Sequence, residues 1–223
     1  IVTGPKSRDL FENVGTDADL STGWLTHQAA TVAGKPVHLN RVSFAGELGW
    51  EVHADMAHIP ALHAAITDEG ATPFGMYALN SMRIEKGYRA WKGDLSTDYT
   101  LLEGGMERFV KFDKPQDFPG KAALASEKQS GRKKGFVTMT IDDECAFDAP
   151  YMSTIWKGDE VVGEVTSSAI GYRTNKCIAL GMLRVDLLEP GTKLEVEIFG
   201  GRYGVTVQED QPMWDPANER LRA

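Results

Sequence analysis

The sequence predicts an α+β fold: an α/β part followed by a small antiparallel β-barrel. Three observations lead to this prediction. Two strand-like segments and then two helical ones occupy residues 37–86, six short strand-like segments separated by turns fill residues 135–207, and the composition changes near residues 131–134. Strands and helices that are segregated along a chain are typical of α+β proteins. We therefore expect an α+β domain over residues 1–131 and a barrel domain over residues 132–223.

The elements of the first half follow from periodicity and from turn residues. Residues 7–14 have helical spacing of apolar side chains, and residues 37–44 and 50–54 alternate as two strands around a turn at residues 46–49. Two helices follow, over residues 57–69 and from Pro73 to about Lys86, each stopped by a glycine. The side chains expected on their buried faces are Ile59, Leu62 and Ile66 in the first helix and Met76, Leu79 and Met82 in the second.

The second half begins with a short helix over residues 121–129. Gly, Pro and Asp residues then separate short segments of alternating polarity, which is typical of a barrel or sandwich. The six expected strands cover residues 135–141, 153–156, 161–167, 177–184, 193–198 and 202–207.

Composition excludes several classes of function. The chain has 32 acidic and 24 basic side chains, a net charge of -8, so nothing attracts a phosphate backbone and no nucleic acid partner is expected. Its longest apolar runs are far shorter than the roughly 20 residues of a membrane helix, so no membrane partner is expected either. Two cysteines, Cys145 and Cys177, are too few for a zinc site and are expected to be packed thiols, and we expect no metal.

Glu51 is the first candidate binding residue. It follows Phe44 and a glycine turn, and strand alternation places it on the face opposite Trp50. A carboxylate there can accept two hydrogen bonds from a planar N–H pair such as the amino-pyrimidine edge of a pterin. The alternative is an ordinary solvent-facing glutamate, which spacing alone favours.

Arg83 and Trp91 are the second candidate pair. Arg83 comes three residues after Asn80, so both lie on one face of the expected helix. An arginine beside an aromatic ring can bind and stack an anionic aromatic ligand. The alternative is a surface ion pair of Arg83 with Glu85 or Asp94.

These clusters together resemble a known family. The stretches Gly46-Glu-Leu-Gly-Trp-Glu51, residues 73–91 and Asp117-Phe-Pro-Gly120 are similar to the glycine-cleavage T-protein (aminomethyltransferase) family. Within that family the resemblance is to the C-terminal, folate-binding region of the sarcosine and dimethylglycine dehydrogenases, and it spans nearly the whole chain.

The resemblance implies a one-carbon function. It implies that tetrahydrofolate is the cofactor, that Glu51 holds the pterin edge, and that Arg83, Phe44 and Trp91 line the folate site. It further implies that an upstream FAD domain of the same parent chain oxidises a small N-methyl amine, and that the folate part captures the one-carbon unit as methylenetetrahydrofolate. Two alternatives stay open: a stand-alone folate-dependent demethylase or aminomethyltransferase, and a non-catalytic folate-binding module.

Two departures from the family affect these expectations. The family often has Tyr where this chain has Phe44, and T-proteins usually have Tyr where it has Trp91. The aspartate near the folate amine lies upstream of the point that matches Ile1, so the catalytic residue is unknown here, and we expect the chain to be a catalytically incomplete portion of a longer parent. The expected compartment is intracellular: cytoplasmic in a bacterium and the mitochondrial matrix in a eukaryote.

Overall fold

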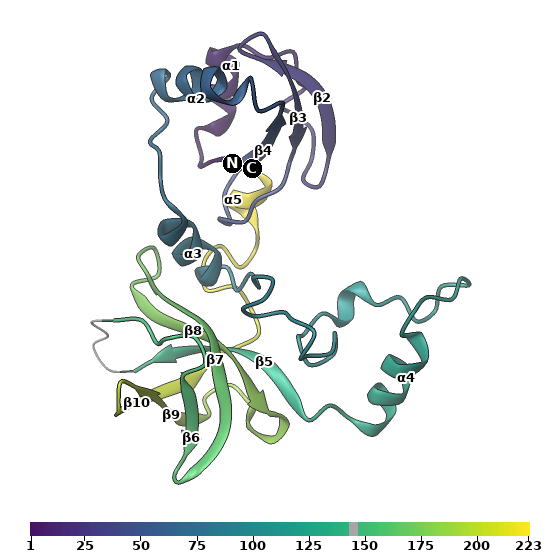
Figure 1. The fold of residues 1–223 in the computed structure, drawn as a ribbon, viewed down its shortest axis with the longest axis vertical. Coiled ribbons are helices and arrows are strands. Elements are labelled where there is room, and N and C mark those ends of the chain that lie inside the picture. Colours follow the sequence, from purple (N-terminus) through teal and green to yellow (C-terminus); the bar gives the residue numbers. More distant parts are fainter. Residues whose placement is uncertain (143–146) are drawn as a thin grey trace. The chain divides into compact units, whose positions relative to one another are not determined.

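A computed structural model describes residues 1–142 and 147–223. The chain forms two compact units, which Figure 1 shows. The first unit consists of Ile1–Lys86 together with the C-terminal segment Pro212–Ala223, and the barrel unit consists of Gly87–Gln211.

A four-stranded antiparallel sheet organises the first unit. The strand order is β1-β4-β3-β2, so the two predicted strands lie in the middle and each has a partner on its other side. The sequence predicted only these two strands, and β1 and β2 extend the sheet on either side of them. The bounds are Val2–Thr3 for β1, His27–Val32 for β2, Lys35–Asn40 for β3 and Gly49–Ala54 for β4.

Two helices complete the core of the first unit, α1 (Ser7–Val14) and α2 (Ile59–Asp68). The ring of Phe11 meets the ring of Trp50 edge to face, with centroids 5.4 Å apart, and Leu62 belongs to the same buried cluster. Leu62 is buried as expected, whereas Ile59 is exposed, since α2 packs against α1 and Leu62 is its only buried residue. The inner face of the sheet is thereby covered, and its outer face carries polar side chains.

The helix α3 (Met76–Glu85) has its buried residues at its C-terminal end. Leu79 is buried as predicted, whereas Met76 is exposed. The last turn buries Arg83, Ile84 and Glu85. This end of α3 therefore carries the side chains that matter for the site.

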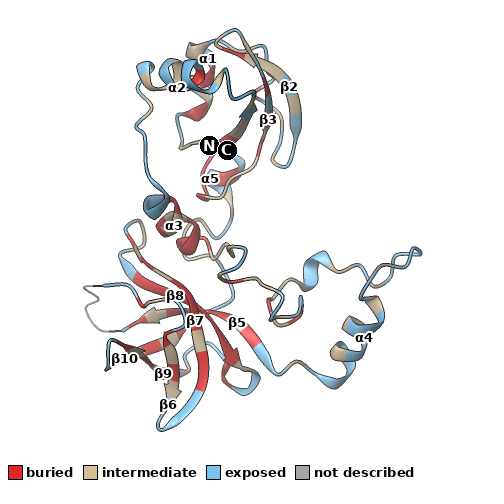
Figure 2. Cartoon of the chain, in the orientation of Figure 1, coloured by how far each residue is buried: buried red, intermediate tan, exposed pale blue. Residues whose placement is uncertain are grey.

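The barrel unit contains a closed antiparallel barrel with the strand order β10-β5-β8-β7-β6-β9, which confirms the predicted α+β fold with a barrel. Alternation is clear along β5, where every second side chain is buried, and Figure 2 shows the buried residues along the strands. The six bounds are Lys134–Ile141, Thr154–Lys157, Glu160–Gly171, Lys176–Arg184, Lys193–Ile198 and Gly201–Val207 for β5 to β10.

The helix α4 (Lys121–Ser130) and the short helix η1 (Glu107–Phe109) precede the barrel strands, η2 (Val185–Leu187) follows β8, and α5 (Glu219–Arg222) ends the chain.

The compact units are divided after Lys86, whereas the predicted domain boundary lies near residue 131. The reason is that residues 87–131 make their contacts within the barrel unit, as in the hydrogen bond from the Phe136 N–H to the Glu103 carbonyl.

Cys177 on β8 is buried and disulfide-bonded, so the expectation of a packed thiol is wrong for this residue. Cys145 lies outside the described residues. None of the helices in residues 1–142 and 147–223 has the length and apolar character needed to cross a membrane.

Candidate functional site

Glu51 lies on the outer face of the first unit's sheet. Trp50, its neighbour on β4, is fully buried, whereas the Glu51 side chain is 37% exposed. The predicted alternation is thus present. The Glu51 Oε2 atom lies 3.0 Å from Nε2 of His53, two residues along the same face. This carboxylate is therefore accessible and partly oriented.

A row of imidazoles continues from Glu51 across that face. His53 is directly opposite His38 on β3, and Nδ1 of His38 lies 3.1 Å from Nε2 of His27 on β2. This row was not predicted, and the signal that could have found it is strand alternation, which places residues 51 and 53 on one face of β4. Within the described parts of the chain, no group of three or more acidic, Cys or His side chains is arranged to hold a metal ion.

Arg83 is buried at the end of α3. Its Nε–H donates to Oδ1 of Asn80 at 2.8 Å, so the predicted shared face is present. Arg83 is only 3% exposed, so it is not a surface residue. Phe44 is half-buried in the loop between β3 and β4, in the same unit as Glu51 and Arg83.

A buried polar network uses other residues of the motifs. Nζ of Lys86 donates to Oδ2 of Asp215 at 3.1 Å and to the Trp214 carbonyl at 3.2 Å. Glu47 accepts the Trp214 indole N–H at 2.9 Å through Oε1, and Arg220 reaches its other oxygen. Gly46 has a φ of +75°, and a Cβ there would lie 2.9 Å from the Lys86 side chain. Glu47 and Glu51 are four residues apart and have different roles. Glu47 binds the C-terminal segment through Trp214 and Arg220, whereas Glu51 faces outward.

Asp215 keeps its charge within this network. Burial by itself raises the pKa of its carboxyl group, but the backbone N–H of Arg220, the Lys86 ammonium and the N–H of Leu221 hold that pKa below its usual value. The charge of Asp215 therefore balances the fully buried ammonium of Lys86.

Trp91 belongs to the barrel unit, where a tight loop presents it. The side chain is 68% exposed, and Lys92, at a φ of +72°, donates its N–H to the Leu95 carbonyl at 2.6 Å. Asp94 is fully buried and accepts the Ala90 N–H at 2.8 Å and the Thr166 hydroxyl at 2.5 Å.

A β-bulge explains the contact to Thr166. The pairing of β7 with β8 shifts its register between Val165 and Ser167, which leaves Thr166 between them. Bulges re-aim side chains, and here the re-aimed hydroxyl meets Asp94. The loop that carries Trp91 is therefore anchored to the barrel wall.

Arg89, two residues before Trp91, was not predicted as a site residue. Its guanidinium lies over the Phe136 ring at 4.0 Å, and among the described residues its buried Nε has no hydrogen-bond partner. Burial lowers the pKa of Arg89, against the opposing effect of Asp210. No pattern in the sequence distinguishes this arginine, because its surroundings come from Phe136 on a distant strand.

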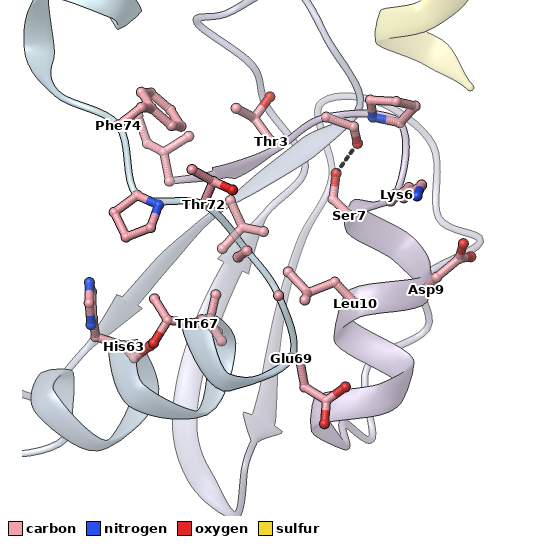
Figure 3. Close-up of a pocket in the computed structure, with 18 of the residues that line it drawn as sticks. Thr3, Lys6, Ser7, Asp9, Leu10, His63, Thr67, Glu69, Thr72 and Phe74 are labelled. Carbon is pink, nitrogen blue, oxygen red and sulfur yellow. Dashed lines mark hydrogen bonds between the residues drawn. The ribbon is translucent and has the colours of Figure 1, made fainter.

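A pocket of about 880 Å³ lies elsewhere in the first unit. It is bordered by the N-terminal segment, α1, α2 and residues 69–76, as Figure 3 shows. Glu51, Arg83 and Phe44 do not line it. This apolar hollow is therefore separate from the predicted binding residues.

Comparison with known families covers most of the chain. The GCVT N-terminal domain matches residues 1–114, and the glycine cleavage T-protein C-terminal barrel domain matches residues 134–215. The chain belongs to the glycine cleavage T-protein family. Glu51, Arg83 and Trp91 all fall in the first matched region of this T-protein-family chain, and the barrel strands fall in the second.

Named relatives of this T-protein-family chain include dehydrogenases and aminomethyltransferases. It is 37% identical to mitochondrial dimethylglycine dehydrogenase of Homo sapiens and 34% identical to mitochondrial sarcosine dehydrogenase of Mus musculus, over 99% of this chain and 26% and 25% of the relatives. It is 34% identical to aminomethyltransferase of Saccharopolyspora erythraea, over 92% of this chain and 57% of that protein. The chain thus spans about a quarter of the dehydrogenases that it matches.

A solved structure has the same fold. The glycine cleavage system aminomethyltransferase T from Bartonella henselae superposes with a TM-score of 0.86 at 20% identity, over 96% of this chain and 58% of that protein. The mixed α/β unit and the closed barrel are therefore features shared with an aminomethyltransferase T protein.

Proposed function

We propose that this chain is the tetrahydrofolate-binding portion of an enzyme that captures a one-carbon unit as methylenetetrahydrofolate. The parent would be an N-methyl amino acid dehydrogenase of the sarcosine or dimethylglycine type, whose upstream FAD domain oxidises the amine. Relatives named as dimethylglycine and sarcosine dehydrogenases, matched over 99% of this chain, support this choice.

The observation that carries the proposal is the orientation of Glu51. Its carboxylate faces outward, and its one hydrogen bond among the described residues is to His53. A carboxylate with free lone pairs can accept the two parallel N–H groups of a pterin's amino-pyrimidine edge. The residues present thus fit the folate.

Bound tetrahydrofolate would supply the nitrogen atoms that accept the one-carbon unit. Within this proposal Glu51 binds and orients the pterin, and Arg83, whose guanidinium Asn80 fixes, contacts the folate. Phe44, in the same unit as Glu51, supplies an aromatic contact, and a role for Trp91 stays a prediction from the family resemblance. No residue of this chain is assigned to FAD, which belongs to the proposed upstream domain.

A second candidate is aminomethyl transfer without a dehydrogenase domain. The aminomethyltransferase of Saccharopolyspora erythraea, of which this chain covers 57%, favours it. The full-length protein distinguishes the two, because reduction of bound flavin by an N-methyl amine is expected only from the dehydrogenase.

The Glu51→Gln variant tests the folate site directly. A neutral amide loses the charged hydrogen bond to the pterin edge, so we expect tetrahydrofolate to bind the full-length variant about 1.5–3 kcal/mol more weakly. Isothermal titration measures this. The control is Glu12→Gln, at an exposed position of α1, which should leave affinity unchanged. Unchanged affinity in Glu51→Gln would return Glu51 to an ordinary surface role.

The Phe44→Tyr variant tests the shape of the proposed folate site. We expect tetrahydrofolate to bind about 0.5–1.5 kcal/mol more tightly, because a phenolic hydroxyl adds one hydrogen bond. The same titration measures the effect. Equal or weaker binding would mean that the pocket is shaped for another ligand, and that result would favour a demethylase or a module that binds without catalysis.

A further inference from the structure

His53 is the one side chain that engages Glu51 among the described residues. Both project from the outer face of β4, and the distance from His53 Nε2 to Glu51 Oε2 is 3.0 Å. The two side chains are 57% and 37% exposed, so water and a ligand can reach them. Nothing in the family resemblance concerns this histidine; it comes from the geometry of the strand.

The hydrogen bond leaves Glu51 able to bind a ligand. Each carboxylate oxygen has two lone pairs, so Oε2 can accept from His53 and from a ligand N–H at the same time. The other oxygen of Glu51, Oε1, accepts no hydrogen bond among the described residues. The His53 donor therefore restricts rotation of the Glu51 carboxylate and leaves lone pairs on both oxygens for the N–H groups of a pterin.

The other titratable side chains on the outer faces of β2, β3 and β4 are His38, directly opposite His53, and His27, which is bonded to His38. These two imidazoles contact each other, and His53 is the imidazole that contacts Glu51.

We propose that His53 is a positioning residue that orients Glu51 for ligand binding. This proposal rests on the proposed function, in which Glu51 binds the pterin edge. The N–H of His53 holds the Glu51 carboxylate in place, so affinity for tetrahydrofolate depends on a hydrogen-bond donor at this position.

The test is a set of tetrahydrofolate titrations of the full-length protein at pH 8. The His53→Gln variant keeps an N–H donor, so we expect near-normal affinity. The His53→Ala variant loses the donor, so we expect about two- to fivefold weaker binding, the range of an exposed ion pair.

Controls separate this proposal from its premise. The His63→Gln variant, on α2 away from the sheet face, should keep the unmodified affinity. If Glu51→Gln weakens binding but both His53 variants keep the unmodified affinity, the role of His53 is wrong and the folate site stands. If Glu51→Gln itself has no effect, the proposed function fails first.

Discussion

Replacing Lys86 by alanine is expected to destabilise the first unit by about 3 kcal/mol or more. The change leaves the buried Asp215 carboxylate and the Trp214 carbonyl without their ammonium donor. Removing one partner of a buried ion pair costs more than the pair contributes, because the remaining charge stays desolvated. Urea unfolding of the purified protein measures the loss, and limited proteolysis within residues 212–223 reports release of the C-terminal segment.

The matched control for Lys86 is Lys134→Ala. Lys134 makes an ion pair of the same length, 3.1 Å, with Glu164, but its side chain is 45% exposed. Exposed pairs contribute about 0–1 kcal/mol, so this variant should unfold almost as the parent does. Equal effects of the two substitutions would contradict the buried network.

The same network predicts a dependence on pH. Because the pKa of Asp215 is lower in the folded protein than its ordinary value near 3.9, its contribution is complete above that value and is lost as the pH falls below it. We therefore expect the free energy of unfolding to fall below about pH 4, and to fall less in Lys86→Ala. Acid unfolding monitored by circular dichroism measures how steeply the free energy of unfolding falls with pH in the parent protein and in Lys86→Ala.

Asp94→Ala is expected to destabilise the barrel unit by about 3 kcal/mol. The substitution removes the acceptor of the Ala90 N–H and of the Thr166 hydroxyl, and a buried donor without an acceptor costs about 1–3 kcal/mol. Thermal unfolding measures this effect. Thr166→Val keeps the volume and removes one of these bonds, so its loss should be about 1 kcal/mol. A loss below that of Thr166→Val would mean that Asp94 does not anchor the loop.

Much of the barrel could be predicted because its strands carry their pattern locally. In β5 buried side chains occupy every second position over the whole strand, and turns with Gly158, Gly191 and Gly200 separate several of the strands that follow. The strand β2 was missed because its sequence, His-Gln-Ala-Ala-Thr-Val, has small or polar residues at most positions and no strong alternation. Its conformation is fixed by pairing with β3, which a local pattern does not contain.

In the candidate site, too, local features could be predicted from the sequence and long-range ones could not. The outward direction of Glu51 and the shared face of Asn80 and Arg83 follow from neighbours in the sequence. The structural role of Lys86 does not, because its partner Asp215 is 129 residues away, and Trp214 is 167 residues from Glu47. Long-range partners decide which residues of a motif are structural, and the sequence alone does not reveal them.

The C-terminal segment has a consequence for biosynthesis. Since the barrel unit is one continuous stretch and the first unit is split around it, the ribosome completes the barrel unit before the last twelve-residue piece of the first unit emerges. Domains generally fold as they are made, from the N-terminus onward. Lys86 and Glu47 therefore lack their final partners, Asp215 and Trp214, while more than a hundred further residues are translated.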